Sequence, residues 1–154
     1  MECMGFKIVG SLHIVVVGEK DPTTADWNTY LDAIRLTEKN GVDVSELRTL
    51  VFSDGAGPNA QQRKAVADYL KGRPSPLAIV TGVTIMRGVI TALGWFNSQV
   101  RAFAPEQLEE ALQYLGVPRG RCDAILRDAH AIQSDIKIPP SRAIEAAKRR
   151  FAAA

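Results

Sequence analysis

A glycine-rich segment at residues 53–59 (SDGAGPN) has the residue types and spacing of a phosphate-binding turn. From Gly55 the chain reads G-x-G-x-x-A between a predicted strand and a predicted helix. Such glycines let the backbone approach a phosphate at the positive end of a helix. However, Pro58 lacks a backbone N–H, Asp54 would repel an anion, and no acidic residue ends the next strand. The sequence therefore favours a plain turn capped by Asn59, with an anion or nucleotide site as the alternative.

Side chains that could carry out catalysis are few. Ser53 is a poor nucleophile without a histidine nearby in the sequence, and Asp54 has no partner acid for acid–base chemistry. His13 lies in a predicted strand and His130 in a predicted C-terminal helix. Two histidines and two cysteines also leave little for a metal site. We therefore predict a protein without catalytic residues, metal or cofactor. A small hydrolase or transferase acting through Ser53 or Asp54 is a further alternative.

Strand and helix patterns alternate along residues 6–116. Apolar, β-branched runs at 6–9 and 12–17 are separated by Gly10-Ser11, which suits a type II′ hairpin because glycine allows the positive φ of its first position. Further strand patterns lie at 47–52, 77–80 and 100–103, and helix patterns lie at about 24–40, 60–70, 84–96 and 105–115. The order β-β-α-β-α-β-α-β-α predicts an α/β fold with a mixed, mostly parallel sheet of about five strands and covering helices.

The carboxyl ends of the parallel strands should meet at one edge of this sheet. Side chains that follow the strands at 47–52 and 77–80 are therefore expected to gather in one crevice. Arg87 could donate a charge-assisted hydrogen bond there to an acidic group of a partner. The candidate residues for binding a partner or a ligand are Ser53, Asp54, Gly55, Gly57, Asn59, Thr81, Gly82 and Arg87.

Residues 119–154 are predicted to form a basic helical extension to a domain of residues 1–118. Helical spacing covers 119–136, and a further helix follows Pro139-Pro140-Ser141 to about Phe151. The formal charge is −2 in the domain and +4 in the extension, although the whole chain carries only +2. That near-neutral total excludes a dedicated nucleic-acid-binding protein. We expect its helices to pack on the domain or to fray into solvent. The alternative is contact with an acidic partner, nucleic acid or an anionic membrane surface through Lys148, Arg149 and Arg150.

The helix expected at 84–96 is apolar on most sides, which indicates either deep burial or cover by another chain. The second case includes a homo-oligomer. Trp95 and Phe96 near its end, together with Trp27, belong either to the core or to an exposed aromatic patch for a partner. No apolar run is long enough for a transmembrane segment, and residues 1–5 lack the pattern of a signal peptide. We therefore expect a cytoplasmic protein.

Three segments carry a resemblance to a known family: residues 79–96 (IVTGVTIMRGVITALGWF), 100–103 (VRAF) and 108–112 (LEEAL). With the order of elements, they resemble the STAS domains and, more specifically, small SpoIIAA-like proteins of bacteria over residues 6–116. The resemblance implies a regulatory module without catalysis that binds a protein partner in signalling. A domain that binds a small molecule or nucleotide in the crevice is the alternative. In the anti-sigma-factor antagonists a phosphorylatable serine follows the aspartate of this turn, whereas here Ser53 precedes Asp54, so we assign no phosphorylation site.

Overall fold

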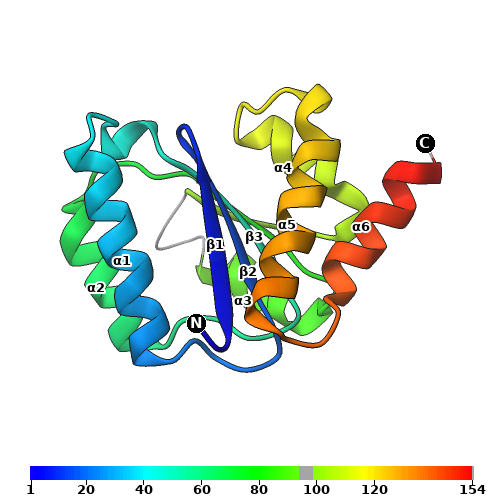
Figure 1. The fold of residues 1–154 in the computed structure, drawn as a ribbon, viewed down its shortest axis with the longest axis horizontal. Coiled ribbons are helices and arrows are strands. Elements are labelled where there is room, and N and C mark those ends of the chain that lie inside the picture. The colour runs from blue at the N-terminus through cyan, green and yellow to red at the C-terminus, as the bar shows by residue number, and fades with distance from the viewer. Residues whose placement is uncertain (94–98, 154) are drawn as a thin grey trace.

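A five-stranded sheet forms the centre of the computed structural model, which describes residues 1–93 and 99–153 (Figure 1). β1 is antiparallel to β2, and all other neighbouring pairs are parallel. The α/β fold with a mixed, mostly parallel sheet that we predicted is therefore confirmed. The strands lie side by side in chain order: β1 (Met4–Val9), β2 (Leu12–Val17), β3 (Arg48–Ser53), β4 (Leu77–Val80) and β5 (Val100–Phe103).

The first two strands form the tight hairpin expected from Gly10-Ser11. Val9 pairs with Leu12, so the connection has two residues. Gly10 has a φ of 62°, whereas Ser11 is not among the residues with positive φ. This combination is the one that a type II′ turn requires.

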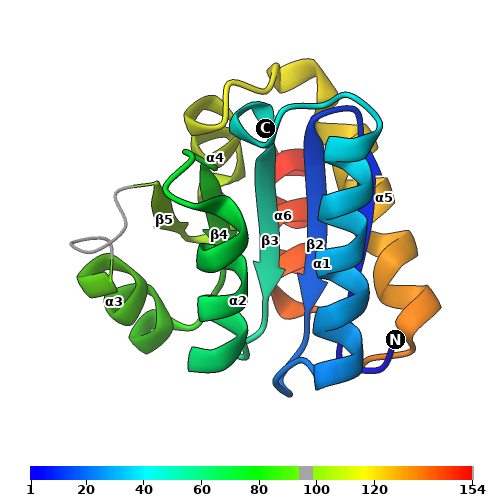
Figure 2. The same cartoon turned by 90° about the vertical axis from the view of Figure 1, so that its left-hand side faces the viewer.

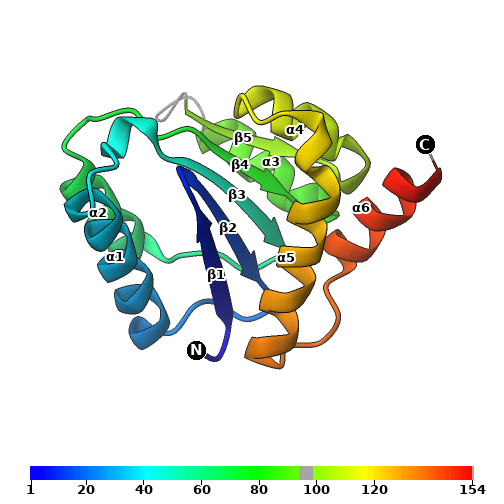
Figure 3. The ribbon, with the colours of Figure 1, turned by 45° about the horizontal axis from the view of Figure 1, so that its top comes forward.

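Helices cover both faces of the sheet. α1 (Thr24–Lys39), α2 (Ala60–Leu70) and α3 (Thr84–Leu93) follow β2, β3 and β4 respectively. After β5 come α4 (Leu108–Tyr114), α5 (Cys122–Ile136) and α6 (Arg142–Ala153). Figure 2 shows α1 and α2 in front of the sheet and α6 behind it. Figure 3 shows α5 and α6 together on the side of the sheet opposite α1 and α2.

The first strand begins earlier than the predicted range of 6–9. The carboxylate of Asp26 accepts hydrogen bonds from the backbone N–H groups of Glu2 (3.0 Å) and Cys3 (2.8 Å), which fixes the chain just before Met4. Burial alone would raise the pKa of Asp26, but the backbone N–H donors outweigh it, so its pKa lies below the usual value. A contact between residues so far apart in the sequence leaves no local pattern.

Two predicted helices begin with a 3₁₀ turn instead of an α-helix. These turns are η2 (Pro105–Gln107) and η3 (Arg119–Arg121), and the α-helices α4 and α5 start only after them. In η2 the side chain of Gln107 accepts a hydrogen bond from the backbone N–H of Ala104 (2.9 Å), which closes the tight turn. A third turn, η1 (Val44–Glu46), precedes β3. The predicted end of the α3 segment, with Trp95 and Phe96, lies outside the described residues.

Two hydrophobic cores lie on the two faces of the sheet. On one face, Trp27 of α1 is buried and its indole N–H donates to the backbone carbonyl of Gln62 (3.0 Å), so Trp27 belongs to the core. The other face buries Leu12, Ile14, Val16, Leu50 and Phe52 beneath α4, α5 and α6.

The predicted extension supplies eight of the twenty buried residues of that second core among the described residues. Ile125 and Ile132 of α5 and Ile144 of α6 are buried against the inner strands of the sheet. Lys7 of β1 also forms an ion pair with Asp128 of α5 (2.6 Å). α5 and α6 therefore pack on the same sheet as the helices before them, with α5 against β1 and β2 and α6 against β3.

Gly5 allows the close approach of α5 to β1. A Cβ atom at this position would lie 2.7 Å from Cγ2 of Ile132 and 2.8 Å from Cγ2 of Ile136. Because these methyl groups sit on stiff β-branched side chains, Gly5→Ala should lower the free energy of unfolding by about 1–3 kcal/mol in urea denaturation. Gly120→Ala is the control, since a Cβ there meets nothing within 4 Å. Equal stability of Gly5→Ala and the wild type would contradict this packing.

Candidate functional site

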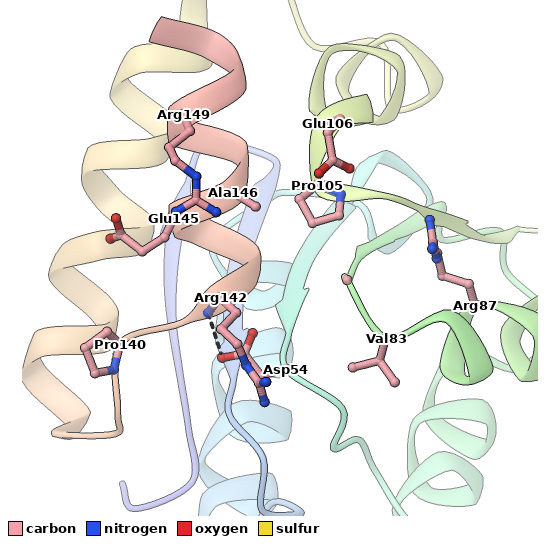
Figure 4. A pocket seen from close by; sticks show the side chains of 11 residues that line it. Asp54, Val83, Arg87, Pro105, Glu106, Pro140, Arg142, Glu145, Ala146 and Arg149 are labelled. Atoms are coloured by element: carbon pink, nitrogen blue, oxygen red, sulfur yellow. Dashed lines mark hydrogen bonds between the residues drawn. The ribbon is translucent and has the colours of Figure 1, made fainter. Parts of the chain in front are cut away.

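A crevice of about 620 Å³ opens at the carboxyl ends of β3 and β4 (Figure 4). Its walls come from the loops that follow these strands, from η2 and from α6. The lining residues are Asp54, Gly82, Val83, Arg87, Pro105, Glu106, Pro140, Arg142, Glu145, Ala146 and Arg149. We call this site the crevice.

The topology explains why the crevice lies there. The connections from β2 to β5 each move one strand in the same direction, so right-handed crossovers place α1, α2 and α3 on one face. The chain leaves β5 toward the other face, where α4 packs on β4 and β5. The loops after β4 and β5 therefore run apart, and ligands of open α/β sheets bind at such a switch point.

Asp54 holds the start of α6 beside the sheet. Its carboxylate accepts hydrogen bonds from the backbone N–H groups of Arg142 (3.2 Å) and Ala143 (3.0 Å) and from the hydroxyl of Ser141 (3.2 Å). The negative charge also suits the positive end of the helix. Asp54 thus positions one wall of the crevice, including Arg149.

Ser53 closes its own turn instead of facing the crevice. The side chain is buried, its hydroxyl donates to the carbonyl of Ala56 (2.7 Å), and it accepts from the backbone N–H of Gly55 (3.1 Å). No histidine or carboxylate of the described residues contacts this hydroxyl. Among those residues, nothing can activate Ser53 as a nucleophile.

Backbone N–H groups of the glycine-rich segment also donate hydrogen bonds to acceptors within the segment or in neighbouring segments. Gly57 donates its backbone N–H to Asp21 (3.2 Å). Asn59 and Gln62 accept reciprocally from each other's backbone N–H (both 2.9 Å), so the predicted cap by Asn59 is confirmed. Gly55 has a φ of 129°, which only glycine adopts without strain. These contacts favour the plain turn over the anion site.

The crevice brings together some of the predicted site residues and leaves others out. Asp54, Gly82 and Arg87 line it, and Arg149 of the extension joins them. Ser53, Gly55, Gly57, Asn59 and Thr81 do not line it. Thr81 is buried and accepts a hydrogen bond from the backbone N–H of Val83 (3.2 Å).

Sequence reasoning missed much of the lining. Val83, Pro105 and Glu106 follow strands β4 and β5, so the rule for carboxyl ends could have found them. Pro140, which precedes α6, and Arg142 at its start gave no such signal, because their position depends on hydrogen bonds from the start of α6 to Asp54, almost ninety residues earlier in the chain.

The other basic candidates lie beside the crevice. The ammonium of Lys148 is 3.8 Å from the carboxylate of Glu145, and Arg150 lines a smaller pocket of about 170 Å³ together with Cys122. Burial, with the nearby carboxylates of Glu109 and Asp123, raises the pKa of Cys122 to about 11. Its thiol is therefore protonated at neutral pH and is a poor nucleophile.

His13 lies away from the crevice, near the start of β2. The ring is fully buried, Nδ1 is 3.4 Å from the hydroxyl of Tyr30, and Nε2 has no hydrogen-bond partner among the described residues. Burial lowers the pKa of His13 to about 4 and raises the pKa of Tyr30 to about 12. Both groups are therefore neutral at pH 7.

The sequence matches no protein-family model, and no curated protein or solved structure is significantly similar to it. The resemblance to STAS domains stays a prediction. No helix within the described residues is long and apolar enough to cross a membrane. In the same part of the chain, no cluster of three or more histidine, cysteine, aspartate or glutamate residues could hold a metal ion.

Proposed function

We propose that this domain is a non-catalytic regulatory module of bacterial signalling that binds a protein partner through the crevice. The observation that carries the proposal is the exposure of Val83, which is 36% accessible and lines a crevice that also has charged lining residues. Exposed apolar side chains framed by charges are typical of partner sites.

The surroundings of Val83 support this proposal. Pro140 and Ala146 on the α6 side and Pro105 of η2 are further apolar lining residues, and Arg87 and Arg149 line the crevice as well. An arginine in such a lining can form charge-assisted hydrogen bonds with a carboxylate of the partner. The engagement of the Ser53 hydroxyl with Ala56 supports binding without turnover.

The crevice also lies where small ligands bind in open α/β sheets, which favours a small-ligand or nucleotide binder as the second candidate. The two candidates differ in a thermal-shift experiment with nucleotides, inorganic phosphate and lipids. Saturable stabilisation by one of these compounds that is lost in Val83→Asp would favour the second candidate.

Replacing the exposed apolar side chain tests the proposal directly. Val83→Asp should abolish recovery of a specific partner in affinity capture from a bacterial lysate, because a charge would replace the apolar contact. Leu36→Asp is the matched control, since Leu36 is 56% exposed on α1, on the other side of the molecule. Equal recovery of the same partner by Val83→Asp, Leu36→Asp and the wild type would contradict a partner site at the crevice.

A further inference from the structure

Several charged groups of the crevice already have partners within the chain. The carboxylate of Asp54 accepts three hydrogen bonds from the start of α6. The guanidinium of Arg142 pairs with Glu19, and Glu145 pairs with Lys148. Figure 4 also shows the Glu145 side chain pointing away from the η2 wall. These charges are balanced before any partner binds.

Among the described lining residues, two opposite charges remain on the facing walls, since the guanidinium of Arg87 donates to the hydroxyl of Thr84 (3.2 Å). Arg149 lies on α6, and Glu106 lies on η2 across the crevice (Figure 4). Within the described residues, neither forms a hydrogen bond or an ion pair, and they do not pair with each other. Val83 lines the same crevice.

The backbone holds both walls firmly, so the separation of the two charges does not depend on a free loop. Pro105 of η2 is buried, and the Gln107 side chain closes the η2 turn through the N–H of Ala104. On the other side, Ile144 is fully buried and Asp54 fixes the start of α6. Such pre-organised charges select a partner by geometry as well as by sign.

From these observations we infer that the crevice binds a peptide segment of the partner in which one acidic and one basic side chain flank an apolar one. The acidic group pairs with Arg149, the basic group pairs with Glu106, and the apolar group covers Val83. A purely acidic segment would meet Glu106, and juxtaposed like charges in an interface oppose binding. This inference rests on the proposed function, since it specifies the chemistry of the partner at the same site.

Four short peptides with capped ends and a central leucine test the charge pattern. Their flanking charges are acid–base, base–acid, acid–acid and base–base, and binding is measured by fluorescence anisotropy at low and high salt. One of the two mixed peptides should bind about tenfold tighter than either like-charged peptide, since a pre-organised ion pair in an interface contributes on the order of tenfold in affinity.

Charge reversal sharpens this test. Arg149→Glu and Glu106→Lys should each weaken binding of the preferred mixed peptide, whereas the double variant should prefer the other mixed peptide. The control is Arg127→Glu, at an exposed position of α5, and this variant should bind the peptide as tightly as the wild type does. Because all three positions are on the surface, thermal unfolding should show that every variant is folded.

Tightest binding of the acid–acid peptide would overturn the inference, and so would no binding of any peptide at millimolar concentration. Partner capture separates this failure from failure of the proposed function. Partner capture could be lost in Val83→Asp but unchanged in Arg149→Glu and Glu106→Lys. That result would support a partner site at the crevice and overturn the proposed charge pattern. Capture lost in all three variants would support both.

Discussion

Asp54→Ala should lower the free energy of unfolding by about 2–3 kcal/mol, because three donors at the start of α6 lose a charged acceptor. Asp54→Asn should lose less, since one acceptor oxygen remains. Urea denaturation measures the total effect. Hydrogen exchange should show the loss concentrated in the amides of α6, which would open more often than those of β2 and β3.

Two comparisons make the Asp54 prediction specific. Asp135→Ala removes an exposed carboxylate of α5 and should leave stability unchanged within about 0.5 kcal/mol. Ser141→Ala removes one of the three donors and should reproduce part of the loss. If Asp54→Ala unfolds like the wild type and the α6 amides exchange at unchanged rates, Asp54 does not hold α6 in place.

Acid should destabilise the protein through His13 well before most carboxylates are protonated. Burial lowers the pKa of His13 from 6.5 to about 4, so the folded state resists the proton that the unfolded state accepts. The contribution of neutral His13 to the free energy of unfolding is fully present above pH 6.5 and is lost as the pH falls toward 4. The difference in pKa corresponds to about 3 kcal/mol of unfolding free energy.

Substitution by leucine isolates this contribution. His13→Leu cannot gain a proton, so its unfolding free energy should fall less between pH 7 and pH 4 than that of the wild type. Urea denaturation at several pH values measures the two slopes. His130→Gln, on the exposed side of α5, should keep the wild-type slope. Parallel profiles for His13→Leu and the wild type would show that His13 does not titrate on unfolding in this range.

The order of strands and helices along the chain and the hairpin followed from local patterns. The apolar run of β2 marks an interior strand because both of its faces are buried, and Gly10 marks a two-residue turn because its φ is positive. Ile125 and Ile132 fall at helical spacing, which predicted an apolar helix face but not the surface that this face covers. That surface depends on Gly5, whose missing side chain leaves room for α5.

The site was only partly predictable for a similar reason. The position of Asp54 at a strand end predicted that it would lie in the crevice, and it does. Its residue type suggested a base or a group that repels anions. The hydrogen bonds that it accepts from Arg142 and Ala143 show that it holds the start of α6 instead. No rule of local spacing relates residues 54 and 142.

The cover that α5 and α6 provide for one face of the sheet has a consequence for synthesis on the ribosome. Leu12, Ile14 and Phe52 are translated well before α5 and α6, the helices that bury them, because both helices follow all five strands in the chain. The sheet therefore exposes an apolar face until residues 122–153 have emerged, and the native state cannot form gradually from the first strand onward. A nascent chain of this protein depends on α5 and α6, or on a chaperone until they emerge, to avoid aggregation.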